Sequence, residues 1–116
     1  MSATRRRLRP EDALQQERSR VLRLSEALSG DLRELVESTE GSASDDEHDP
    51  DGGSGYEREY TSTLLDQARA RVVELEAALA RLDEGTYGTC TSCGNRIGDE
   101  RLEALPATES CIACAT

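Results

Sequence analysis

The stretch that decides the fold is CTSCGNRIGDERLEALPATESCIAC, residues 90–114. It contains all four cysteines of the chain, arranged as two Cys-x-x-Cys pairs that are 17 residues apart. Each pair places two thiols on one tight turn, and two such turns brought together form the tetrahedral sulfur cage that zinc favours. Cys90, Cys93, Cys111 and Cys114 are therefore predicted to bind one zinc ion per chain.

The predicted zinc site is closed, because four thiolate ligands leave no coordination position for water. The zinc is therefore expected to be structural and to help fold residues 86–116, which hold few apolar side chains. Gly94, directly after the first pair, suits a left-handed turn. The alternatives are two disulfides or a redox Cys-x-x-Cys motif, but paired cysteines in a reducing cytosol are more often metal ligands. A zinc enzyme would need an open site and a general base, so the chain is not expected to be an enzyme.

Upstream of the cysteines, residues 56–83 carry apolar side chains at alternating steps of three and four. This series predicts a helix with a coiled-coil seam, and it comprises Leu65, Ala68, Val72, Leu75, Leu79 and Leu82. Gly85 follows the series and is expected to end the helix in a left-handed conformation.

Residues 10–38 carry a second apolar stripe, which predicts another helix. Leu14, Val21, Leu28 and Leu35 recur every seven residues, and Leu24 and Leu32 fill in between them. Gly30 lies inside the pattern and should weaken the helix by about 1 kcal/mol relative to Ala. Because the two helices match in length, we expect a monomer with an antiparallel coiled-coil hairpin over residues 10–85. The alternative is that the stripes pair between two chains.

The connection between the two helices, residues 39–55, is rich in Ser, Gly and acidic residues. Five acidic residues fall within the seven positions from Asp45 to Asp51. Loops of this length are usually either functional or disordered, and the alternative to a functional tip is a solvated acidic turn. Residues 1–9 form a short basic tail with four arginines, a feature that is more often disordered than functional.

The composition favours a mostly α-helical protein. The 116 residues include no Phe or Trp, so a thick globular core is not expected. The net charge of −10 disfavours strong binding to nucleic acid, which requires basic patches that neutralise phosphates. The chain has no apolar stretch near the ~20 residues of a membrane span and no apolar secretory signal, so we expect a cytoplasmic protein without a membrane partner.

The residues around the cysteines resemble the DksA/TraR family, bacterial regulators that bind RNA polymerase and carry a C4-type zinc finger. Thr91 departs from the Asp, Glu or Ser that is usual after the first cysteine. The resemblance continues more loosely over the helices, and the Asp-Glu-His-Asp-Pro loop looks like that of actinobacterial members. The densest part rests on Tyr87-Gly88, Cys90-x-x-Cys93-Gly94, Ile97, Arg101-Leu102, Ala104, Pro106 and Cys111-Ile112-x-Cys114.

This resemblance implies a transcription regulator whose hairpin enters the secondary channel of RNA polymerase and directs its tip carboxylates at the catalytic magnesium, without direct DNA recognition. The family's tip motif is Asp-x-x-Asp-x-Ala. Here Asp49-Pro50 matches its start, while Gly52 and Ser54 stand where its second Asp and its Ala would be. If the motif is instead aligned to start at Asp46, two carboxylates remain three positions apart, at Asp46 and Asp49, but Asp51 stands in place of the Ala. The candidate tip residues are accordingly Asp46, Asp49 and Asp51.

Two other functions remain open at this point. A zinc ribbon that binds DNA would display basic residues around the cysteines, whereas this segment has two arginines, Arg96 and Arg101, against four acidic residues, Asp99, Glu100, Glu103 and Glu109. A coiled-coil adaptor for another cytoplasmic protein fits the two helices equally well.

Overall fold

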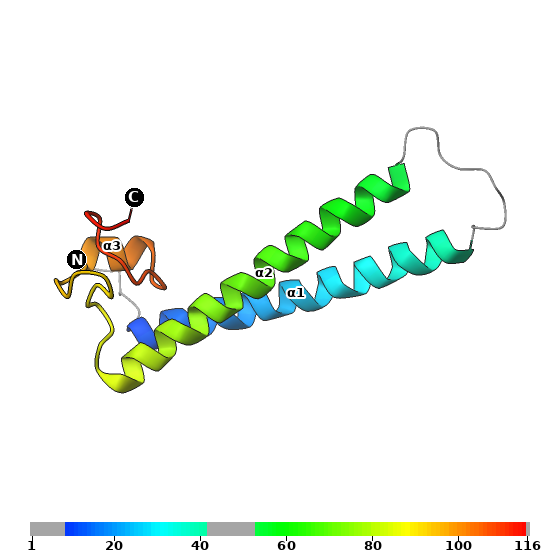
Figure 1. Cartoon of the computed structure of the whole chain (residues 1–116). Coiled ribbons are helices and arrows are strands. Elements are labelled where there is room, and N and C mark those ends of the chain that lie inside the picture. The colour runs from blue at the N-terminus through cyan, green and yellow to red at the C-terminus, as the bar shows by residue number, and fades with distance from the viewer. Residues whose placement is uncertain (1–8, 42–52, 116) are drawn as a thin grey trace, which may run out of the picture. The chain divides into compact units, whose positions relative to one another are not determined.

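The computed structural model describes residues 9–41 and 53–115. Two long helices, α1 (Pro10–Gly41) and α2 (Gly53–Glu84), are followed by the short helix α3 (Asp99–Ala104) (Figure 1). Within the described residues there is no β-strand, and one isolated bridge joins Thr89 to Arg96. The predicted fold class, an antiparallel helical hairpin followed by a small segment with four cysteines, is confirmed.

Parts of the sequence-based predictions fall outside the described residues. These are most of the basic tail, the greater part of the acidic connection, and the three candidate tip carboxylates, Asp46, Asp49 and Asp51.

Both long helices extend beyond the ranges predicted from the apolar stripes. The first helix continues from the predicted end at Ser38 to Gly41, and the second begins at Gly53, three residues before Tyr56. Glycine weakens a helix interior by about 1 kcal/mol, so a pattern-based boundary stops short of glycine-rich ends. Neither long helix, nor any other helix in the described part of the chain, is long and apolar enough to cross a bilayer.

The chain divides into two compact units, one made of residues 1–19 and 72–116 and the other of residues 20–71. In the first unit the start of α1 packs against the end of α2. Leu14 of α1 and Leu75 of α2 are both fully buried there. The Arg18 guanidinium pairs with the Glu76 carboxylate at 2.7 Å, which joins the two helices at the edge of their seam.

The seam of this first unit differs in detail from the predicted stripe. Ala78, which the stripe omitted, is fully buried, whereas Leu79 and Leu82 are only half-buried.

In the second unit the side chains of α1 become less buried toward the end of the helix. Val21 of α1 is buried, as are Leu65 and Ala68 of α2, but no side chain of α1 between residues 22 and 38 is buried. The prediction that Leu24 lies in the stripe is wrong, because its side chain is 46% exposed. Ser25, four residues after Val21, is partly buried, and its hydroxyl donates a hydrogen bond to the Leu22 carbonyl of its own helix at 2.9 Å.

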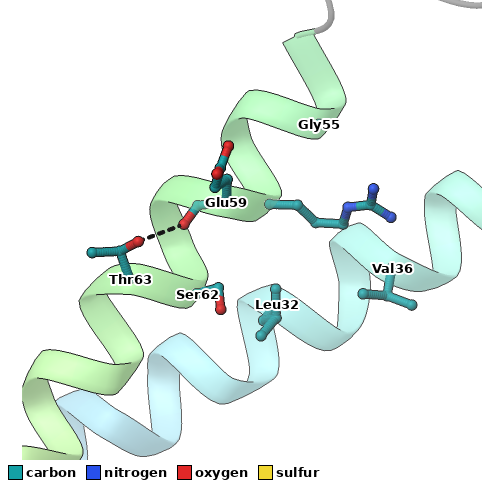
Figure 2. A pocket seen from close by; sticks show the side chains of 7 residues that line it. Leu32, Val36, Gly55, Glu59, Ser62 and Thr63 are labelled. Atoms are coloured by element: carbon teal, nitrogen blue, oxygen red, sulfur yellow. Dashed lines mark hydrogen bonds between the residues drawn. The ribbon is translucent and has the colours of Figure 1, made fainter.

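A groove of about 520 Å³ lies between the helices of this second unit. Leu32 and Val36 line it from α1, whereas α2 contributes Ser62 and Thr63 (Figure 2). The Thr63 hydroxyl donates a hydrogen bond to the Glu59 carbonyl in its own helix at 3.0 Å. The apolar side chains of α1 thus meet polar residues of α2, which explains why this part of the hairpin has no buried core.

Candidate metal centre

The four cysteines meet at one point. Their sulfur atoms all lie within 4.8 Å of one another, and the sulfurs of Cys93 and Cys111 are 3.7 Å apart. A tetrahedral zinc site with Zn–S bonds of about 2.3 Å has S···S edges of roughly 3.8 Å. A disulfide requires about 2.05 Å, and all four cysteines are free thiols. The geometry of the cluster therefore fits a zinc ion and does not fit two disulfides.

The first cysteine pair is held in a tight turn by backbone hydrogen bonds. The amide of Cys90 donates to the Asn95 carbonyl at 2.8 Å, and the amide of Gly94 donates back to the Cys90 carbonyl at 2.9 Å. Gly94 has a φ of 79°, which confirms the left-handed turn predicted at this position. The Ser92 amide points at the Cys90 sulfur at 3.4 Å. The turn thus presents backbone donors to the thiolate.

The second cysteine pair is placed by contacts with the first turn and with α3. The amide of Cys114 donates to the Cys111 carbonyl at 3.0 Å and closes the second turn. The Thr91 amide donates to the Glu109 carbonyl at 2.9 Å, so the two turns are linked by their backbones. From α3, the Arg101 Nε donates to the Ser110 carbonyl at 2.9 Å. This last bond fixes the residue that immediately precedes Cys111.

A small apolar cluster supports the sulfur cage. Cys90, Ile97 and Cys111 are buried together, and Leu102 of α3 packs against them with Cys114. This is a small core, consistent with a segment whose folding would depend on a metal.

The cysteine segment is anchored to the end of α2. Gly85, with a φ of 85°, ends the helix as predicted, and the Thr86 amide donates to the Arg81 carbonyl at 2.9 Å in a Schellman arrangement. The Arg81 side chain, 12% exposed, donates hydrogen bonds to the carbonyls of Ala107 and Thr108, both at 3.3 Å.

Two further contacts reinforce this anchor. The Arg81 guanidinium lies 3.8 Å from the Glu109 carboxylate, and the Tyr87 hydroxyl donates to the Pro106 carbonyl at 2.8 Å. The role of Arg81 was not predicted from the sequence. The available signal was that Arg81 is the basic residue in the last turn of α2, where a cation complements the helix dipole.

The electrostatics of the cluster favour a bound cation. Hydrogen bonding from the backbone of Cys111, aided by Cys93 and Ser92, lowers the pKa of the Cys90 thiol to about 6. Hydrogen bonding with the side chain of Cys111, followed by those of Cys93 and Cys90, raises the pKa of Cys114 to about 12. The thiol of Cys90 is therefore lowered in pKa by donors around it, whereas that of Cys114 is raised mainly because it shares hydrogen bonds with the other three cysteines. A divalent cation would replace these shared protons and hold all four side chains as thiolates.

The sequence profile of the prokaryotic dksA/traR C4-type zinc finger matches residues 85–116, the segment that contains the sulfur cage. Among curated proteins, the RNA polymerase-binding transcription factor DksA of Salmonella typhimurium is 33% identical over 103 residues, which cover 84% of this chain and 68% of that protein. The protein of the same name from Haemophilus influenzae is 39% identical over 70 residues, 59% of this chain. The chain spans 48% of the length of the Haemophilus protein.

A solved structure has a similar fold. The transcription factor DksA2 from Pseudomonas aeruginosa superposes with a TM-score of 0.72 at 26% sequence identity. The superposition covers 90% of this chain and 75% of the Pseudomonas chain.

Proposed function

The chain belongs to the DksA/TraR family of C4-type zinc-finger proteins, and from this premise we propose that it is a transcription regulator that binds RNA polymerase. The observation that carries the proposal is the 103-residue similarity to an RNA polymerase-binding transcription factor. An alignment of that length extends well beyond residues 85–116 and so includes helices of the hairpin. A shared zinc finger alone would support a weaker conclusion, since similar metal sites serve many functions.

One zinc ion per chain would be held by Cys90, Cys93, Cys111 and Cys114. The fit of the sulfur cage to tetrahedral zinc supports this assignment. With four thiolates the ion would have a structural role. It would join the two cysteine turns, and the contacts of Arg81 would connect the joined turns to α2.

The finer part of the proposal follows the family resemblance. The hairpin would enter the secondary channel of the polymerase, and the acidic connection would approach the catalytic magnesium. Magnesium is a hard cation that prefers oxygen ligands, so carboxylates such as Asp46, Asp49 and Asp51 could act on the ion or its water shell. On this proposal the protein works as a monomer in the cytoplasm, as a binding protein and not as an enzyme.

Direct DNA binding through the zinc finger is the less favoured alternative. Arg101 is engaged with the Ser110 carbonyl, and Arg96 lies 4.0 Å from the Asp99 carboxylate. Arg81 is largely buried and close to Glu109. Arg101 and Arg81 are thus occupied by contacts within the protein, and the exposed Arg96 lies beside an acidic residue, which disfavours sequence-specific DNA recognition that depends on phosphate contacts. A coiled-coil adaptor would bind a protein other than RNA polymerase, so the identity of the partner distinguishes it from the leading proposal.

The test is direct binding of the purified, zinc-loaded protein to purified RNA polymerase, with a labelled chain and fluorescence anisotropy. We expect saturable binding that survives about 150 mM salt, at which exposed charges more than roughly 8 Å apart are largely screened. A chain that binds duplex DNA under these conditions but not the polymerase would support the zinc-ribbon alternative. A chain that binds neither would contradict both functions.

A further inference from the structure

The start of α2 carries an exposed aromatic pair. Tyr56 and Tyr60 are two of the three tyrosines in a chain without Phe or Trp. Their rings lie nearly parallel, with centroids 6.5 Å apart and an interplanar angle of 6°. Tyr56 is 70% exposed and Tyr60 is 58% exposed. Tyrosine is enriched at the cores of protein interfaces, because its large rigid surface costs little conformational entropy to bury.

Acidic residues line the same groove as one of these tyrosines. Tyr60 lines a groove of about 530 Å³ between α1 and α2, and the groove also includes the carboxylates of Asp31, Glu34 and Glu57. All three acidic residues are exposed. None of the residues that line the groove is basic, and the other residues are Leu35, Ser38 and Thr61. The surface therefore combines an aromatic face with three carboxylates and no basic residue in the groove lining.

The chemistry of this surface selects its partner. A guanidinium group is planar, stacks on aromatic faces and pairs with carboxylates in a bidentate manner, so arginine satisfies both features at once. A nucleic acid could stack its bases on the rings, but its phosphates would face three carboxylates. A second copy of this chain would bring the same negative charge to the contact.

We propose that Tyr56, Tyr60 and the carboxylates of Asp31, Glu34 and Glu57 form a docking surface for an arginine-bearing segment of the protein partner. The inference rests on the proposed function for the identity of that partner, RNA polymerase. The surface contributes to the affinity for the partner, because an arginine would stack on the tyrosine rings and pair with the carboxylates on the side of the hairpin. This contribution is separate from the zinc site and from the acidic connection.

The experiment measures the affinity of the full-length, zinc-loaded chain for RNA polymerase, with wild type and three variants. Tyr60→Leu keeps an apolar side chain but removes the ring, and it should weaken binding roughly fivefold or more. Tyr60→Phe keeps the ring and should bind like wild type. Glu34→Gln should weaken binding at low salt by a margin that shrinks as the salt concentration rises.

Two matched controls on α2 separate this surface from general effects. Asp66→Asn removes an exposed carboxylate and Val73→Ala trims an exposed apolar side chain, and neither position lines the groove. Both controls should bind like wild type, and far-ultraviolet circular dichroism should show unchanged helix content in every variant.

The possible failures are distinguishable. If wild type binds and Tyr60→Leu binds equally well, the docking surface is wrong while the proposed function stands. A loss of affinity that is equal in the variants and the controls also contradicts the docking surface. If wild type does not bind the polymerase, both proposals fail. Sedimentation that reveals a dimer of wild type, which Tyr60→Leu dissociates, would assign the surface to self-association and overturn the inference.

Discussion

The Arg81 guanidinium in the last turn of α2 donates a hydrogen bond to the carbonyl oxygen of Thr108 at 3.3 Å, three residues before Cys111. The same side chain bonds to the Ala107 carbonyl, and its own backbone carbonyl accepts from Thr86 after the helix end. A single residue thus connects the helix terminus with the approach to the second cysteine turn. The four-cysteine cluster and α2 are joined through this residue as well as through the intervening chain.

Removal of the metal should unfold the cysteine segment selectively. Zinc binding and folding are coupled in small sites with few apolar contacts, whereas most helical residues of the chain lie in α1 and α2. We expect one zinc per chain by elemental analysis. A chelator should make four thiols reactive while most of the helical circular dichroism signal remains, and Cys111→Ser should expose its three remaining thiols with the same retention of helix. A purified reduced protein with no metal and no reactive thiols would contradict the zinc assignment.

Arg81→Ala should loosen the contact between α2 and the cysteine segment. The side chain is 12% exposed and its partners include two carbonyls, so its loss should lower the free energy of unfolding by about 1–3 kcal/mol. Zinc should also transfer to a competing chelator faster than in wild type. Arg69→Ala, at an exposed position of the same helix, is the matched control and should change neither quantity. Equal chelation rates in wild type and both variants would argue against the coupling.

Tyr87→Phe should remove the hydrogen bond to the Pro106 carbonyl at a cost of about 1 kcal/mol near neutral pH. Burial raises the pKa of the Tyr87 hydroxyl above its usual value near 10, and the positive charge of Arg81 opposes this. Because the folded-state pKa is raised, the associated stability is fully present below the unfolded pKa and is lost as pH rises through the folded pKa.

The measurement for Tyr87 is urea unfolding at pH 8 and again above pH 10. The stability difference between wild type and Tyr87→Phe should narrow at the higher pH, while Tyr56→Phe, at an exposed ring, should match wild type at both. A difference that stays constant with pH would show that ionisation of Tyr87 is not linked to folding.

Two glycine substitutions should have opposite effects. Gly30 lies inside α1, and a Cβ there would meet nothing within 4 Å, so Gly30→Ala should stabilise the helix by about 1 kcal/mol. Gly85 has a φ of 85°, and Gly85→Ala should cost about 1–2 kcal/mol because L-residues disfavour that conformation. Chemical unfolding of the two variants side by side checks both signs. A destabilising Gly30→Ala would contradict the open space that surrounds this position in α1.

On the proposed function, the acidic connection should affect transcription more than binding. Asp49→Asn should change output on a sensitive promoter in vitro while leaving polymerase affinity nearly unchanged, because the carboxylate would act near the magnesium. Asp45→Asn, further from the Asp49-Pro50 step, should have a smaller effect. If both variants match wild type at saturating protein, the connection is a solvated turn, and any regulation must come from occupancy of the polymerase channel.

The sequence by itself determined the main elements. The spacing of the four cysteines predicted the cysteine cluster, two apolar stripes with helical periodicity predicted the two long helices, and glycines at residues 85 and 94 predicted left-handed turns. These signals are local, because spacing fixes which side chains share a turn or a face, and a left-handed φ favours glycine.

The tertiary structure decided how those elements meet. In the structure Leu24 is exposed and Ser25 is partly buried, Ala78 is fully buried, and Leu32 lines a groove with polar residues of α2. Arg81 anchors the cysteine segment through its hydrogen bonds. These outcomes depend on the rotation of one helix against its partner and on contacts between residues more than 20 positions apart, such as Arg81 and Thr108. An apolar stripe in the sequence defines the buried face of a helix only to within about one residue, because 3.6 residues per turn does not divide seven evenly. The surface of the partner helix then determines which of the neighbouring residues is buried.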